Sequence, residues 1–333
     1  MTRAARVSIA ATVVVVTVIG GFVAWRLSVA SSRATPPAAA PAEIAARPAG
    51  EPIASGSSAE APSSAAPPRA SPTRPSASGW FASAPPVPAP KPRVLPFEVG
   101  EELQYLVLWS AGGTASLPAG DAVFRVGQGA SRPGVARPGF RFELTVTTAS
   151  WISTFFEAKD RFWSLTGPDL GPMTHVQELN EGRRHLTRTM TFDGERQRVM
   201  VGSGPPDAMT DTVEFAWVPG VRDPLGAFYQ SRLIAISPAT RLSLPVNNAG
   251  HALTLVLSGA GKTDVAAEGL TQPALLLDAR LDEAGIQDPN PTARVWLSTD
   301  DRRIPLAIEV TGSFGTFRVE LKTYRRGVPA PGA

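Results

Sequence analysis

Three charged side chains between Trp151 and Ser164 are the residues best suited to chemistry: Glu157, Asp160 and Arg161. Two carboxylates beside a guanidinium could divide general acid and general base work between them, provided that they converge in one cleft. Closely spaced opposite charges more often form a structural ion pair. The sequence leaves both interpretations open and favours the ion pair.

Other motifs that could carry chemistry are incomplete. The Gly-Lys-Thr tripeptide at 261–263 resembles the end of a phosphate-binding loop, but Val256 stands where that loop needs its first glycine. No long helix follows to direct its dipole at a phosphate, so we interpret the segment as a hairpin turn. No Gly-x-Ser-x-Gly elbow occurs, and Asp300 and Asp301 belong to a Thr-Asp-Asp-Arg-Arg stretch that is typical of a solvated turn.

Metal chemistry also lacks a motif. The chain has no cysteine, which excludes disulfides, thiolate metal ligands and a lipoprotein acylation site. The three histidines, His175, His185 and His251, do not show a close metal-binding spacing, and the last two should lie on strands with their side chains in solvent. We therefore expect no metal, no cofactor and no enzyme activity.

Aromatic side chains gather in the stretch WISTFFEAKDRFW, Trp151 to Trp163, which holds five aromatics in a chain that is 7% aromatic. Its first half should form a turn or a single helical turn. From Lys159 onward, alternation predicts a strand with two faces, one carrying Arg161, Trp163 and Leu165 and the other Asp160, Phe162 and Ser164. A strand with aromatics on both faces needs cover on both.

One cover could be the main core, and the other could be a helix, a ligand or the membrane. Core packing is the commoner use of large aromatics. The alternative is an apolar groove between the sheet and a helix, with these candidate lining residues: Trp151, Phe155, Phe156, Trp163, Phe228 and Tyr229.

Period-two alternation bounded by Gly and Pro dominates the sequence from about residue 94 to 326. In FRFELTVTT, residues 140–148, apolar and polar side chains alternate as a half-buried strand requires. Similar strands are predicted over residues 102–109, 122–126, 183–192, 251–258, 273–281, 293–298, 305–310 and 315–324. The fold class is mainly β, with a large antiparallel curved sheet or open β-barrel-like domain.

One short helix should pack on this sheet. Asp223 can cap it, Pro224 suits its first turn, and apolar residues from Leu225 to Ile236 lie on one face. Pro238 then ends it.

The N-terminus predicts a membrane anchor. Residues 7–25 carry no charge, and at helical rise they span about 28 Å, close to the roughly 30 Å hydrocarbon core of a bilayer. A cleaved signal peptide is the alternative, because Ser28-Val29-Ala30 offers small residues, although its apolar run is usually shorter. We favour an uncleaved anchor in the inner membrane with the C-terminal domain in the periplasm; cleavage and secretion to the periplasm is the alternative location.

A tether follows the anchor. From residue 34 to 95, 15 of the 33 prolines occur among Ala and Ser, which favours extended, solvated chain. The predicted organisation is therefore a cytoplasmic tip and anchor or signal peptide over 1–30, a disordered linker over 31–95, a β-rich domain over 96–326 and a disordered tail over 327–333. A net charge of +3 is too small to favour a nucleic-acid partner.

Four segments resemble a known family. PFEVGEELQYLVLWSAGGTASL at 96–117, the aromatic stretch with its Lys-Asp-Arg at 159–161, RDPLGAFYQSRLIAI at 222–236 and VWLSTDDRRIPLAIEV at 295–310 are similar, in the same order, to segments of the bacterial domain of unknown function 3108. The chain departs from the family at 111–114, where a Gly-rich turn replaces a longer apolar stretch. The resemblance implies an antiparallel β protein of the Gram-negative envelope and no known reaction.

Three classes of function stay open. The first is a non-enzymatic, membrane-anchored periplasmic protein whose β domain binds a lipid, glycan or protein partner. The second is a structural or assembly factor of the cell envelope without a small ligand, which a large exposed apolar patch would indicate. The third is an envelope-polymer hydrolase, which would need convergent acids or a Ser and His pair in one cleft.

Overall fold

The computed structural model describes residues 95–111, 115–129, 138–154, 157–283, 293–312 and 315–328. The expected anchor, nearly all of the linker and most of the C-terminal tail lie outside these ranges, as do Phe155 and Phe156. The predicted domain organisation therefore stays a prediction. No helix within the described ranges is long and apolar enough to cross a bilayer.

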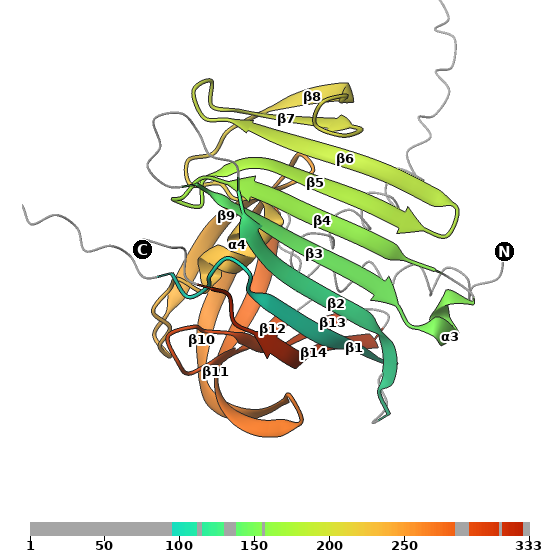
Figure 1. Cartoon of the computed structure of the whole chain (residues 1–333). Helices are drawn as coiled ribbons and strands as arrows, with labels where there is room; N and C mark the ends of the chain where they lie inside the picture. The colour runs from blue at the N-terminus through green and yellow to red at the C-terminus, as the bar shows by residue number, and fades with distance from the viewer. Residues whose placement is uncertain are drawn as a thin grey trace, which may run out of the picture. The chain divides into compact units, whose positions relative to one another are not determined.

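A single antiparallel sheet of 14 strands makes up the described part of the chain. Consecutive strands pair as neighbours on each side of a central seam, where β1 pairs with β14, and the sheet order is β8-β7-β6-β5-β4-β3-β2-β1-β14-β13-β12-β11-β10-β9 (Figure 1). The strands are β1 Glu102–Ser110, β2 Leu117–Gln128, β3 Phe140–Thr148, β4 Lys159–Thr166, β5 Pro172–Glu181, β6 Arg184–Asp193, β7 Arg198–Ser203, β8 Thr210–Ala216, β9 Arg241–Asn248, β10 His251–Ala267, β11 Leu270–Glu283, β12 Ala293–Ser298, β13 Pro305–Gly312 and β14 Gly315–Arg325. The prediction of a mainly β, antiparallel domain is confirmed.

Two helices belong to the described ranges. The first, α3 (Ser150–Ser153), is the single helical turn expected before β4. The second, α4 (Pro224–Ser231), packs against β3, β4 and β9 and lies between the two halves of the sheet (Figure 1). Every residue from Pro224 to Tyr229 is buried, so α4 is an internal helix that packs into the core of the domain.

The main core lies on one face of the sheet, which we call the inner face. It joins alternate side chains of β1–β4 to those of β13 and β14 and to α4. In β3 the buried residues are Phe142, Leu144 and Val146, every second position, as the alternation predicts. Their burial against α4 explains why this part of the sheet needs no other cover.

The sheet bends far enough for distant strands to meet across its inner face. The Gln177 side chain on β5 donates to Oδ1 of Asn248, at the end of β9, at 2.7 Å. The backbone N–H of Ala249 lies 2.9 Å from Sδ of Met190 on β6. These contacts bring the end of β9 over β5 and β6, although β9 does not pair with either strand.

Strands β5, β7 and β8 were not anticipated from the sequence. On β5 three of the four inner-face positions from 175 to 181 are polar and buried, namely His175, Gln177 and Glu181, and only Leu179 is apolar. Strand β8 is mostly exposed on both faces. Period-two hydrophobicity cannot reveal a strand whose inner face is polar, as in β5, or uncovered, as in β8. Strand β7 does alternate, with Val199 and Val201 buried, but it has only six residues.

The expected hairpin turn at 261–263 was wrong. Strand β10 continues through these residues to Ala267, with an irregularity in its pairing between Gly259 and Gly261. The reversal comes at Glu268 and Gly269, whose φ angles of 51° and 74° suit a two-residue hairpin loop. A side chain at Gly259 would place its Cβ 2.0 Å from the carbonyl oxygen of Ser237, so this glycine permits a close backbone approach rather than a turn.

Helix α4 is shorter than the apolar pattern predicted. It ends at Ser231, and the next backbone N–H groups, of Arg232, Leu233 and Ile234, bond to carbonyls three residues earlier. The pattern from Leu225 to Ile236 therefore covers one α-helix and a tighter turn. Arg232, whose side chain is buried, is the first residue of this tighter turn.

Candidate functional site

The N-terminus of α4 carries the group most similar to a catalytic site, and it consists of Ser164, His175 and Asp223. Ser164 and His175 face each other in the β4–β5 register, and Asp223 is the N-cap of α4. Oγ of Ser164 lies 2.5 Å from Oδ1 of Asp223 and 2.9 Å from Nδ1 of His175, and Nδ1 is 3.4 Å from Oδ1. All three side chains are buried.

This Ser, His and Asp group does not have the geometry of a hydrolase triad. In a triad, the serine hydroxyl donates to one imidazole nitrogen and the acid binds the other. Here serine and aspartate both lie at Nδ1. Because the carboxylate can only accept, the serine proton points to Asp223, and Oγ accepts from Nδ1–H of His175. The histidine therefore cannot take the serine proton.

The group instead stabilises the start of α4. The N–H of Gly226 donates to Oδ1 of Asp223 at 2.9 Å, which completes the predicted cap. Burial opposes ionisation of Asp223, but the hydrogen bonds from His175, Ser164 and Gly226 outweigh it and hold the pKa of this carboxyl below its ordinary value. A carboxylate at a helix N-terminus also interacts favourably with the helix dipole.

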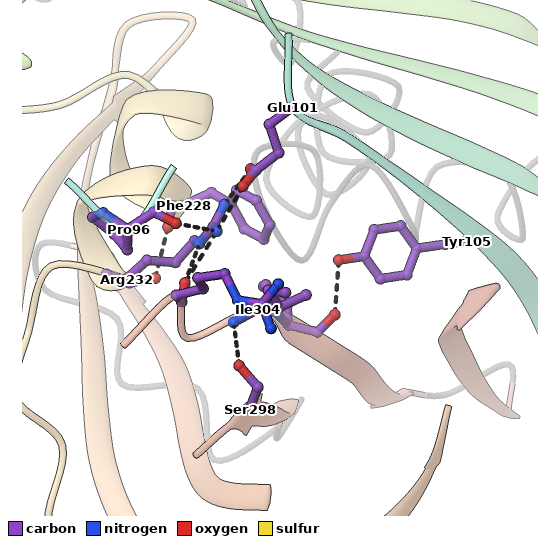
Figure 2. A network of polar contacts seen from close by, with 10 residues as sticks. Pro96, Glu101, Tyr105, Phe228, Arg232, Ser298 and Ile304 are labelled. Atoms are coloured by element: carbon purple, nitrogen blue, oxygen red, sulfur yellow. Dashed lines mark hydrogen bonds and ion pairs between the residues drawn. The ribbon is translucent and has the colours of Figure 1, made fainter. Parts of the chain in front are cut away.

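The C-terminus of α4 ends in a second buried polar network, centred on Arg232 (Figure 2). Its guanidinium binds the carboxylate of Glu101 through two contacts of 2.6 and 3.1 Å, and it also donates to the carbonyls of Pro96 and Arg302. Both charged side chains are almost completely buried, at 0% and 1% exposure. A cation at a helix C-terminus again suits the dipole.

The Arg232 network joins three separate parts of the chain. Pro96 and Glu101 precede β1, Arg302 lies in the β12–β13 turn, and Arg232 follows α4. Tyr105 on β1 donates to the carbonyl of Pro305 at 2.8 Å, which adds another connection between the same strands (Figure 2). The network holds these three parts of the chain together, and we call it the clamp. Its role is structural, because the charges of Arg232 and Glu101 are paired with each other and buried away from solvent.

Between β4 and β7 the inner face becomes polar. The register aligns Phe124, Leu144, Phe162, Gln177, Arg188 and Ser203 in one row across β2 to β7. The first three of these are apolar and buried, and the last three are polar. Along this row the main core therefore gives way to polar side chains at β5, while the neighbouring positions Met190, Phe192, Val199 and Val201 form a second buried apolar cluster with Val221. We call this part of the inner face, on β5–β7, the mixed surface.

Two carboxyl groups lie at one end of this mixed surface, Asp160 on β4 and Glu181 on β5. Asp160 is 2% exposed and accepts from the N–H of Asn180 at 2.8 Å. Burial raises its pKa to about 6, with a smaller contribution from Glu181. Burial likewise raises the pKa of Glu181, against the opposing effect of Arg184 at 3.4 Å.

The six candidate groove residues do not form one group. Trp163 lies on the outer face of the sheet, beneath the Arg141 guanidinium, and donates to Glu178. Phe228 and Tyr229 lie in the core on the opposite face, stacked on Phe124 and Phe142. Trp151 is 45% exposed on α3 and donates to the carbonyl of Pro118. Phe155 and Phe156 lie outside the described residues.

The aromatic stretch is thus neither wholly core nor one groove. Phe162 enters the main core and Trp163 points the other way, as the predicted alternation of β4 requires. A shared site beside Trp163 and Phe228 is excluded by the sheet between them.

The three charged candidates also separate. Glu157 pairs with Lys159 at 2.7 Å, and both are exposed. Arg161 pairs with Glu143 at 2.9 Å on the outer face. Asp160 faces inward, away from both. Glu157 and Arg161 therefore take the structural ion-pair role that the sequence favoured, each with a different partner.

Sequence reasoning missed Ser164, His175 and Arg232 as members of polar networks and Arg188 as a half-buried cation. The one local signal is β5 itself, where His175, Gln177 and Glu181 occupy three of the four inner-face positions from 175 to 181. Across the described ranges, no group of three or more His, Cys, Asp or Glu side chains is placed to hold a metal ion.

Three solved structures are similar to this chain at low identity. A beta-barrel-like protein of the domain of unknown function DUF1849 from Brucella abortus has a TM-score of 0.49 and 10% identity, covering 69% of this chain and 98% of that chain. A protein with a YmcC-like fold from Bacteroides fragilis has a TM-score of 0.31 and 11% identity, covering 70% and 98%. A hypothetical protein from Chlamydia trachomatis has a TM-score of 0.30 and 12% identity, covering 70% and 90%. No curated protein matches the chain.

The fold and its buried networks define an antiparallel β domain built around a capped internal helix. The model of a family described as a protein of unknown function, DUF3108, matches residues 104–322, more than half of the 333-residue chain. The chain belongs to the DUF3108 family, which confirms the resemblance seen in the four sequence segments.

Proposed function

We propose that this protein is a non-enzymatic envelope protein that binds a partner molecule on the inner face of its sheet. The observation that carries the proposal is the change along that face from a closed apolar core under α4 to the mixed surface of β5–β7. Ligand sites usually combine apolar walls with a few polar groups that fix orientation. The mixed surface offers both.

The proposal includes an uncleaved anchor that holds the β domain in the periplasm. Its support is the uncharged stretch at 7–25 and the proline-rich tether that follows. A lipid, a glycan or an envelope protein could each meet the inner face in this location. Since the Ser164 group cannot activate its hydroxyl, it gives no support to the hydrolase alternative.

Native mass spectrometry of the full chain, released gently from membranes, tests the proposal. A bound molecule at unit stoichiometry, absent after denaturing extraction, is the expected result. Leu186→Asp on the inner face of β6 should lower the occupancy, whereas Val213→Asp on exposed β8 is the matched control. Circular dichroism must show that both variants fold. An empty wild-type chain would refute a stably bound ligand.

A structural or assembly role is the second candidate. The observation that favours it is the pair of exposed apolar side chains Trp151 and Leu117, at 45% and 46%, connected by the bond from Trp151 to the carbonyl of Pro118. Exposed aromatic side chains are common at protein interfaces. Crosslinking in membranes with a photoreactive group at position 151 should then capture one protein partner reproducibly. If no protein is crosslinked from position 151, this result would count against the structural or assembly role.

A further inference from the structure

Three polar side chains lie side by side on the mixed inner surface: Gln177 on β5, Arg188 on β6 and Ser203 on β7. Gln177 and Arg188 are directly opposite in the β5–β6 register, and Arg188 and Ser203 are opposite in the β6–β7 register. Opposite residues in an antiparallel pair share a face and keep their Cβ atoms about 5 Å apart. The three polar side chains therefore lie in one row across β5, β6 and β7.

Arg188 differs from other arginines of the domain in its surroundings. Within the described ranges its side chain forms no hydrogen bond or salt bridge, although it is half-buried. Arg232, by contrast, has a carboxylate and two carbonyls. Burial lowers the pKa of Arg188, and the positive charge of Arg184 lowers it further.

The two acids nearby do not neutralise Arg188. Glu181 pairs with Arg184 at 3.4 Å, and Asp160 accepts from the Asn180 backbone. The charges that act on the Asp160 carboxyl are those of Glu181 and Arg184. A half-buried guanidinium without a counter-charge is unfavourable, so a negative group from another molecule would gain from binding there.

The surroundings of Arg188 also have an apolar side. Leu186 and Met190 stand two residues away on the same face of β6, and Leu179 faces Leu186 from β5. Met190 is buried, while Leu179 and Leu186 are half-buried. A molecule with a charged head and an apolar body could contact both parts.

We propose that Arg188, with Ser203 beside it, binds the phosphate group of an anionic ligand on the inner face of β5–β7. This inference rests on the proposed function and names its ligand class. The planar guanidinium would bind two oxygens of the anion, and the serine hydroxyl could donate to a third. Arg184 would contribute longer-range attraction.

Isothermal titration calorimetry of the full chain in dodecyl maltoside tests the site with three probes. These are dihexanoyl phosphatidic acid, the uncharged dihexanoyl glycerol with the same chains, and inorganic phosphate. We expect the phosphatidic acid to bind, and Arg188→Gln to weaken it by at least about tenfold. Arg196→Gln removes the same charge from an 84% exposed side chain in the β6–β7 turn, and it should leave binding unchanged.

The results separate the possible sources of the anion. Binding of phosphatidic acid without binding of phosphate supports a lipid headgroup, and binding of both supports a free anion. Equal affinity of wild type and Arg188→Gln would overturn the site, as would a wild-type chain that binds neither anionic probe. Binding of dihexanoyl glycerol alone would also overturn the site, but it would leave the proposed binding function standing.

Discussion

Arg232 and Glu101, 131 residues apart in the chain, form a bidentate ion pair that solvent does not reach. The pair connects the end of α4 to the start of β1. Because Arg232 also donates to the carbonyls of Pro96 and Arg302, its burial leaves no part of the charge uncompensated. Burial alone would lower the pKa of Arg232, but the hydrogen bonds that it donates to the Glu101 carboxylate, together with the negative charge of that group, raise it.

Removing one partner of this pair should be strongly destabilising. Arg232→Met leaves the Glu101 carboxylate buried without a counter-charge, so we expect the free energy of unfolding in urea to fall by about 3–5 kcal/mol. Arg326→Met is the matched control, since its pair with Glu98 is exposed and should contribute less than about 1 kcal/mol. The double variant Arg232→Met, Glu101→Met should recover part of the loss. If Arg232→Met and Arg326→Met lowered the free energy of unfolding equally, the structural role of the Arg232 network would be contradicted.

Asp160 should make stability fall as pH rises from about 4 to 6. Its folded-state pKa of about 6 exceeds the ordinary value of 3.8, so the folded protein binds a proton that the unfolded chain has already released. Asp160→Asn keeps an acceptor for the Asn180 N–H and removes the charge. It should be more stable than wild type at pH 7 by on the order of 1 to 3 kcal/mol and equal near pH 4. Urea titrations at several pH values measure the difference in unfolding free energy between wild type and Asp160→Asn. A difference that does not change with pH would exclude the titration of Asp160 as its source.

Ser164 should be structural and unreactive. Ser164→Ala removes the donor at 2.5 Å from Asp223, and we expect a loss of about 1–3 kcal/mol in unfolding free energy. A fluorophosphonate probe, which labels activated serines, should not modify the folded chain. Labelling that disappears in Ser164→Ala would show that the hydroxyl is activated and would revive the hydrolase alternative.

Phe228 and Trp163 should respond very differently to truncation. Phe228→Ala leaves a cavity beside Phe124 in the core and should cost about 3–5 kcal/mol. Trp163→Ala removes a half-buried ring on the outer face, its contact with Arg141 and one hydrogen bond, with an expected cost of about 1 kcal/mol. Urea unfolding of both variants measures the two losses. Similar large losses would mean that Trp163 is covered in solution by another part of the protein.

The strands with apolar inner faces, the cap at Asp223 and the family could all be predicted from the sequence. These features are local: alternation within β3 or β12 and an Asp-Pro start are set by side-chain direction and backbone geometry over a few residues. For the same reason, the two faces of β4 could be assigned before the fold was known, while polar β5 could not be recognised.

The tertiary structure alone decided which of these residues meet. The Ser164 group needs the β4–β5 register and the position of α4, and the Arg232 pair closes a separation of 131 residues. The sequence made Trp163 and Phe228 candidates for one groove, but the sheet places them on opposite sides. Pairing between distant polar groups depends on sheet register and curvature, which arise from the packing of the whole domain, and no short segment of sequence encodes either.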